Sequence, residues 1–479
     1  MSRDAAPSTR EEEAAEHDGQ AAFESYPLVD ALGKRRSRRF SRGMEIDGGP
    51  TAYASDRDPQ PLTETETALL VFAACGITGP PLLDWTYEEG AGGNMMAGMA
   101  GRTISSADAV HSMALFVIED DATWLARRPQ DIPDDELTAI MRLNAEGEFV
   151  EAWRRMRVKV ADERRAPPVE PPYNLNPNRW SLHAEGTTYF LPVSELSHVY
   201  INTLFEFLRP ETGFFVVDDR RQYRPAGLGE FAASDGGHLE DDPSDKHVLT
   251  VDYLERGATE VCLVEQGMAL QNLGLACQAL GLTGFPHYSM HDEAWFEALG
   301  FRMGEKPLTE YFGVPRIPST ILKLRGQNPT MSYPLGLERD GEVLLEPFCP
   351  PYHDSMADAV RAVYERQFGD GGIFRGGHDV VEESDVETGW ADPGEVASDV
   401  PDIDDAALDA TTAYCEYLHD RYGRFPATYP PFHTLMGFQA GHVDEGFYEE
   451  HYQRGALSES HWRHQERWHD RRGERPSPS

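Results

Sequence analysis

The stretch from Val261 to Leu282 constrains the fold more than any other part of the sequence. Its apolar residues fall on several faces of a helix rather than on one: Leu263, Val264, Met268, Leu270, Leu273, Leu275, Cys277 and Leu280. A helix that is apolar all round is not stable facing water. We therefore expect it at the centre of the fold or at a subunit interface, ended by Gly281 or Gly284.

The composition excludes several classes of protein. At 479 residues, the chain is expected to form two or three domains, or one large domain with insertions. A formal net charge of −39 argues against nucleic acid as a partner. Five dispersed cysteines without a CxxC pair argue against a disulfide framework or a thiolate zinc site. The N-terminus lacks the apolar core of a signal peptide, and the longest apolar stretch, near Leu69 to Ile77, cannot span a membrane. We expect a soluble, cytoplasmic protein.

Local patterns predict the elements of the N-terminal half. Residues 1–24 are polar and acidic and are expected to be a disordered tail. The other predictions are a helix through Tyr26 and Leu32, a buried helix over 62–75 with Thr63 as N-cap, a loop over 90–101 that does not match a dinucleotide fingerprint, a buried strand over 112–118, and a helix over 149–160. The segment from about 120 to 245 is interpreted as an insertion.

The C-terminal part is expected to lie outside the main domain. We predict that the domain covers residues 25–345 and is followed by a connecting segment at 346–375. An acidic, proline-containing stretch predicts a solvated linker over 376–405. Residues 406–479 form an extension rich in aromatic residues and histidines, with helical spacing from Leu408 to Tyr422. The extension either docks over a functional pocket or packs on the outer face of the fold.

Three short segments could carry chemistry. In an extended chain, Arg35, Ser37 and Arg39 point to one side and could bind a phosphate, or they belong to a solvated basic turn. The segment around Ser105, Ser106 and Asp108 precedes a buried strand and could bind the edge of a planar heterocycle, or it caps a short helix. Gln271 and Asn272, inside the apolar helix, are either ligand contacts or satisfied core polar groups.

Taken together and in this order, these segments resemble the FMN-dependent nitroreductase superfamily. Arg35 to Phe40 (RRSRRF) resembles its opening RxSxR phosphate motif. LTETETALLVFAACGITGP and GRTISSADAVHSMALFVIED are similar to the branch that contains azoline (thiazole/oxazole) dehydrogenases, and GMALQNLGLACQALGLTGF resembles the long central helix. The similarity spans about residues 25–120 and 246–310.

The resemblance implies an α+β fold with a mixed, largely antiparallel sheet flanked by helices, and a homodimer whose flavin site lies between two chains. Carried over by position, Arg35, Ser37 and Arg39 would bind the FMN phosphate and ribityl chain. Ser105, Ser106, Asp108 and Gln271 would lie near the flavin ring, and the backbone amides of Tyr288 and Ser289 near N5. Lys323 and Arg325 are candidates for a late basic phosphate contact. The usual PSxG is Ser105-Ser106-Ala107-Asp108 here, which adds a carboxylate.

The resemblance also implies an activity. We expect an FMN-dependent oxidoreductase that transfers hydride between NAD(P)H, or another donor, and an organic substrate through flavin N5. The alternatives are dehydrogenation of a peptide or natural product, and a non-catalytic protein that sequesters or senses flavin. No triad or metal set is evident. His461, His464 and His469 could reach a metal from one helix, but a charged, solvated tail is the favoured interpretation, so we predict no metal site.

Overall fold

A seven-stranded antiparallel sheet forms the centre of the protein. The computed structural model describes residues 18–82, 98, 100–289, 291–314, 316–375 and 391–469. From one edge to the other, the strands are β12 (Leu282–Tyr288), β17 (Met436–His442), β8 (Thr187–Glu195), β5 (Met113–Ile118), β6 (Thr123–Ala126) and β7 (Arg157–Ala161), and β16 (Phe432–His433) also pairs with β8. Every pairing in this sheet is antiparallel. The mixed α+β class with an antiparallel sheet flanked by helices is confirmed.

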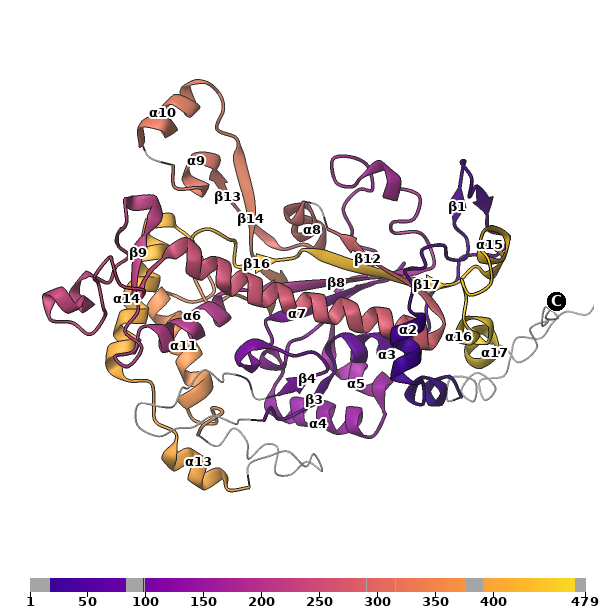
Figure 1. Ribbon diagram of the computed structural model, residues 1–479, viewed down its shortest axis with the longest axis horizontal. Helices are drawn as coiled ribbons and strands as arrows, with labels where there is room; N and C mark the ends of the chain where they lie inside the picture. The colour runs from indigo at the N-terminus through magenta and orange to yellow at the C-terminus, as the bar shows by residue number, and fades with distance from the viewer. Residues whose placement is uncertain are drawn as a thin grey trace, which may run out of the picture.

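One face of the sheet is covered by helices that share an apolar core with it. The first of these along the chain is α3 (Glu64–Cys75). Thr63 caps its N-terminus, as predicted, by accepting from the Glu66 amide. The others are α4 (Asp134–Ala145), α5 (Phe149–Met156) and α7 (Val251–Leu280), and the hairpin β3 (Ile77–Gly79) and β4 (Gly101–Arg102) lies beside them. The short helix α2 (Leu28–Lys34) packs on α7. Figure 1 shows α7 running along the sheet. It begins ten residues before the apolar stretch and ends at Gly281, as expected. Among the described helices, none combines the length and apolarity that a membrane span requires.

The other face of the sheet packs against α8 (Asp292–Leu299) and a second, three-stranded sheet. That sheet consists of β13 (Arg302–Pro307), β14 (Thr330–Arg339) and β15 (Glu342–Leu345). Between β13 and β14 the chain leaves the body of the protein as an arm that carries α9 (Leu308–Tyr311) and α10 (Arg316–Leu324) (Figure 1). The arm exposes Ile317, Ile321 and Leu324.

A second apolar core surrounds the N-terminal end of α7. It is built by α6 (Ser197–Phe207), α11 (Met356–Phe368) and α14 (Asp405–Tyr422), next to a small sheet of β10 (Arg224–Pro225), β9 (Phe215–Asp218) and β11 (Val248–Thr250). The helix expected from Leu408 to Tyr422 is therefore confirmed. The interpretation of residues 120–245 as an insertion is wrong, because this segment contributes β6, β7 and β8 to the central sheet.

The C-terminal segment is part of the main fold. β17 lies between β12 and β8, so the sheet is incomplete without residues 436–442, and the predicted domain end near residue 345 is wrong. The chain then forms α15 (Glu445–His451), which packs on Phe40 and Tyr53, and α16 (Glu459–Trp462) and α17 (His464–Trp468), which lie beside the end of α7. Both expectations for this segment, docking over a pocket or packing on the outer face, are therefore wrong for its strand β17. Apolar residues of that strand, such as Phe438 and Ala440, are part of the core.

Three further expectations differ from the structure. Residues 18–24 are helical, and Gly19 packs against Trp468, so the predicted tail is ordered there; residues 1–17 lie outside the described residues. The helix predicted over 149–160 ends at Met156, since residues 157–161 extend to form the sheet edge β7. Of the predicted linker, 376–390 lies outside the described residues, and α13 (Pro393–Asp399) follows it. Most of the predicted 90–101 loop also lies outside them.

Candidate functional site

The basic run lies along the outer edge of the central sheet. Residues 35–39 follow α2, and Arg38 forms an antiparallel bridge with Gly284 of the edge strand β12. The Gly284 amide donates to the Arg38 carbonyl oxygen over 3.0 Å. Arg38 itself is buried and donates to Gln278 of α7 and to the Ala456 carbonyl. This anchoring holds the neighbouring Arg35, Ser37 and Arg39 at the edge of β12.

The three predicted phosphate-binding side chains do not point to one side. The Arg35 side chain passes over α7, where a Cβ on Gly274 would lie 3.2 Å from its Cδ. Arg39 lies on the other face of β12, with its guanidinium 4.8 Å from the centre of the Phe285 ring, and donates to Asn178 and Ser181. Ser37 is exposed between them. The prediction of a shared side is wrong, because the chain turns at Ser37, where the Arg38 amide donates to the Arg36 carbonyl over 3.1 Å, instead of forming a regular strand.

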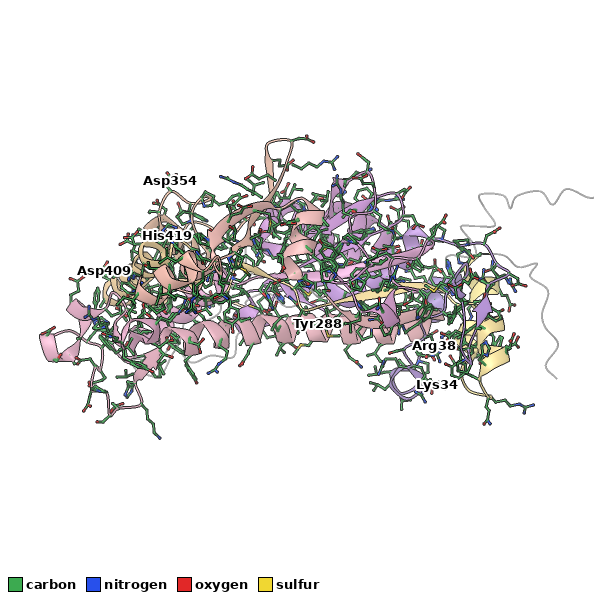
Figure 2. All side chains as sticks on the ribbon, turned by 90° about the horizontal axis from the view of Figure 1, so that it is seen from above. Lys34, Arg38, Tyr288, Asp354, Asp409 and His419 are labelled. Carbon is green, nitrogen blue, oxygen red and sulfur yellow. The ribbon has the colours of Figure 1, made fainter. Side chains whose placement is uncertain are left out.

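The outer edge of β12 presents a backbone amide further along the same strand. The Gly284 amide faces Arg38 on this edge. Because successive residues of a strand direct their backbone groups to alternate edges, Tyr288 directs its amide to the same edge as Gly284. The Ser289 amide instead donates to the Leu435 carbonyl over 3.0 Å and is used by the fold. Of the two predicted amides, only Tyr288 is therefore at the open edge. Figure 2 shows Arg38 toward one end of the molecule and Tyr288 nearer its middle.

The second predicted segment is held by a buried carboxylate of the central helix. Glu265 of α7 accepts from the hydroxyls of Ser106 and Ser112, the latter over 2.7 Å, and from the Met113 amide over 3.2 Å. Burial raises the pKa of the Glu265 carboxyl, and the two hydroxyls partly oppose this effect. Ser106 lies at the N-cap of a short 3-10 helix (Ala107–Ala109), but its hydroxyl makes no capping hydrogen bond. It accepts instead from the His111 amide over 2.8 Å and so holds the Ala107–His111 turn, the structural role that the helix-cap interpretation described.

The same loop holds an unusual backbone conformation. Asp108, Ala109 and His111 have φ angles of 54°, 51° and 50°, in the left-handed region that L-residues with a side chain rarely occupy. Strain of this kind persists only where surrounding contacts enforce it, and it is concentrated at functional sites. Burial raises the pKa of Asp108 to about 6, although its hydrogen bond from Asn202 acts in the opposite direction. The loop thus presents a carboxyl group that can exchange a proton near neutral pH.

The two halves of the predicted site lie on opposite sides of α7 in one chain. Glu265 contacts the Ser106 loop and Gly274 faces Arg35, and these positions are nine residues, about two and a half helical turns, apart. Between them, an exposed stripe of α7 carries Val264, Met268 and the predicted ring contact Gln271. Asn272 donates to the carbonyls of Ala73 and Thr103, as expected for a satisfied core group. Lys323 lies on the arm and pairs with Glu310, away from Arg35.

Two arginine side chains near the edge of β12 could bind an anionic group. The buried Nε of Arg39 has no hydrogen-bond partner among the described residues. No hydrogen bond or ion pair between the Arg35 guanidinium and another described side chain is found. The absent side chain of Gly274 lets the Arg35 side chain pass close to α7, since a Cβ there would lie 3.2 Å from Arg35 Cδ. No family model matches the sequence, and no curated protein sequence matches it.

Two groups of residues were missed by the sequence analysis. Glu265 could have been suspected, because it is an acid within the most apolar helix of the chain. Glu66 and His442 had no such signal. They come from two other parts of the chain, and only the fold brings them beside His464 and His469. The prediction that His461, His464 and His469 belong to a solvated tail is wrong, because α16 and α17 pack against the end of α7 and bury His461 and His464.

Proposed function

We propose that the protein is an FMN-dependent oxidoreductase that acts as a homodimer. The observation that carries the proposal is the outer edge of β12, where the backbone of the basic run pairs with Gly284 and where strand alternation also directs the Tyr288 amide. Arg35 and Ser37 would hold the phosphate, and the Tyr288 amide would donate to the flavin ring. FMN supplies two-electron hydride chemistry at N5. NAD(P)H or another donor would reduce it, and a small organic or peptide substrate would reoxidise it.

The dimer is part of the proposal because one chain holds the two halves of the site apart. A second copy related by two-fold symmetry across α7 would bring its Ser105 to Asp108 loop toward the first copy's Arg35. The exposed stripe of α7 suits such an interface: Val264 is 55% exposed and Tyr253 is 54% exposed. The neighbouring α2 exposes Leu28, Val29 and Leu32 by 57% to 75%. Exposed apolar side chains gathered on neighbouring helices are typical of subunit interfaces.

A specific observation favours dehydrogenation of a peptide or natural product as the second candidate. Loss of a hydride from a substrate must be accompanied by loss of a proton, which a carboxylate with a pKa near the working pH can accept. The pKa of Asp108, raised to about 6, suits that role. For this candidate, Asp108→Asn should abolish substrate oxidation while FMN binding is retained. A substrate reductase driven by NAD(P)H would keep its activity in the same variant.

A titration of the apoprotein with FMN tests the proposal, with a matched pair of arginine variants. Arg35→Ala should weaken binding by about 1.5–3 kcal/mol, roughly 10- to 150-fold, the scale of one charge-assisted hydrogen bond. Arg36→Ala is the control, because the exposed Arg36 guanidinium donates to the nearby carbonyls of Gly33 and Arg35. Quenching of flavin fluorescence gives both affinities. Equal affinities for the two variants would remove Arg35 from the site.

A further inference from the structure

Four side chains from three separate parts of the chain converge beside the end of α7. Glu66 comes from the first turn of α3, His442 from the end of β17, and His464 and His469 from α17 and its C-cap. Their candidate ligand atoms all lie within 4.8 Å of one another. Glu66 Oε1 lies 3.2 Å from His442 Nε2, 3.0 Å from His464 Nε2 and 3.3 Å from His469 Nε2. One carboxylate oxygen therefore faces three imidazole nitrogens.

The backbone fixes which nitrogen of two rings carries hydrogen. His442 Nδ1 lies 2.8 Å from the Gln60 carbonyl oxygen, and His464 Nδ1 lies 2.8 Å from the Leu280 carbonyl oxygen. A carbonyl oxygen can only accept, so both Nδ1 atoms must donate. In the neutral rings, both Nε2 atoms then carry a lone pair directed at the Glu66 carboxylate. The His442 and His469 Nε2 atoms also lie only 3.1 Å apart. Lone pairs gathered this closely repel one another unless a cation lies among them.

The carboxylate is positioned in the same way. Glu66 Oε2 accepts from the Thr63 amide over 2.7 Å, as part of the capping box at the start of α3. This contact leaves Oε1 directed at the histidines. Hydrogen bonds from the outer atoms of ligands to backbone groups are typical of metal sites, since they fix the tautomer and orientation of each ligand. Three of the four ligands, His442, Glu66 and His464, are fixed in part by such contacts with Gln60, Thr63 and Leu280.

The separations suit a small tetrahedral ion. Zinc ligands lie about 2.0–2.1 Å from the ion, which places them about 3.3 Å apart at the corners of a tetrahedron. The contacts of Glu66 Oε1 with the three nitrogens, at 3.0 to 3.3 Å, match that spacing. Three imidazoles and one carboxylate suit zinc better than the all-oxygen sets of magnesium or calcium. The site is also closed, since the side chains of Glu66, His442 and His464 are at most 3% exposed and that of His469 is 12% exposed.

We propose that Glu66, His442, His464 and His469 form a structural zinc site. Four protein ligands leave no position for a water or substrate, which is typical of structural rather than catalytic zinc. The ion would tie α17 to α3 and to the end of β17, and so hold the last described helix of the chain on the fold. The inference is independent of the proposed flavin chemistry, because none of its ligands belongs to the run 35–39 or to the loop 105–111.

Metal analysis of the full-length protein tests the proposal directly. After expression with added Zn²⁺ and dialysis, elemental mass spectrometry should find one zinc per chain. Removal with a chelator should lower the melting temperature, and Zn²⁺ should restore it, because an ion that binds only the folded state stabilises it. Co²⁺ in its place should give the intense visible absorption of a four-coordinate ion. Absence of zinc and no response of the melting temperature to added Zn²⁺ would contradict the proposal and leave a cluster held together by protons alone.

A matched set of variants locates the ion. His464→Gln and Glu66→Gln should each weaken zinc binding by more than roughly 100-fold, the upper end for changes to residues that only hydrogen-bond a ligand. His451→Gln is the control, because His451 is a mostly buried histidine of the same C-terminal segment that lies outside the cluster. It should bind zinc as the unaltered protein does. If His464→Gln keeps full zinc content, or if all three variants lose it equally, the ion does not occupy this cluster. The measurements on the unaltered protein remain decisive where a variant does not fold.

Discussion

Replacement of Asp108 by Asn should stabilise the protein, and more so at higher pH. Burial raises the pKa of this carboxyl from its ordinary value of 3.8 to about 6, and the nearby Glu206 and Glu265 carboxylates add to the effect. The difference corresponds to about 3 kcal/mol of penalty on the ionised form, at about 1.4 kcal/mol per pH unit. Because the folded state binds the proton more tightly, its stability falls as the pH rises from 3.8 through about 6.

The Asn variant lacks this titration but can still accept the hydrogen bond from Asn202. Its advantage in the free energy of unfolding should therefore be about 1 kcal/mol larger near pH 7.5 than near pH 5. Urea denaturation of both proteins at the two pH values measures this difference. Asp235→Asn, at an exposed position, is the control for the loss of one surface charge. An advantage that stays constant with pH, or that shrinks as the pH rises, would refute the account of Asp108.

Two further predictions concern assembly. Val264→Glu should both dissociate the dimer and lower FMN affinity, because it places a charge on the exposed stripe of α7. The control Val343→Glu, at a comparably exposed valine of β15, should do neither. Sedimentation and FMN titration of the two variants measure the difference. Removal of residues 406–479 should prevent folding, since it deletes β17 from the middle of the sheet, so a truncated chain that unfolds cooperatively in a thermal melt would contradict the described topology.

Local elements could be predicted from the sequence because their signals are local. Thr63 with Glu66 three residues later gives the capping box of α3, and Gly281 ends α7 with a φ of 88°. The all-apolar strand β5 was equally recognisable, and each of its six residues is buried. Helix and strand patterns overlapped at residues 157–161, where Val158 and Val160 suit either structure. Pairing with β6 decided in favour of a strand.

The site could be predicted only in part, because its geometry depends on contacts between distant segments. The sequence indicated the run 35–39 and the loop 105–108, but not that α7 separates them in one chain. Pairing of β17 with β8 joins residues about 250 apart, and no local pattern specifies it. The same pairing delivers His442 to Glu66. The histidine spacing in α17 was visible, whereas the two ligands that complete the cluster were not.

The identity of any bound cofactor tests the central claim most directly. Protein purified without added flavin, or reconstituted with it, should show the absorbance bands of oxidised flavin, and mass spectrometry of the released cofactor should identify FMN. Anaerobic addition of NAD(P)H or a chemical reductant should then bleach those bands. A protein that stays colourless after incubation with FMN, or that releases a different cofactor, would contradict the account.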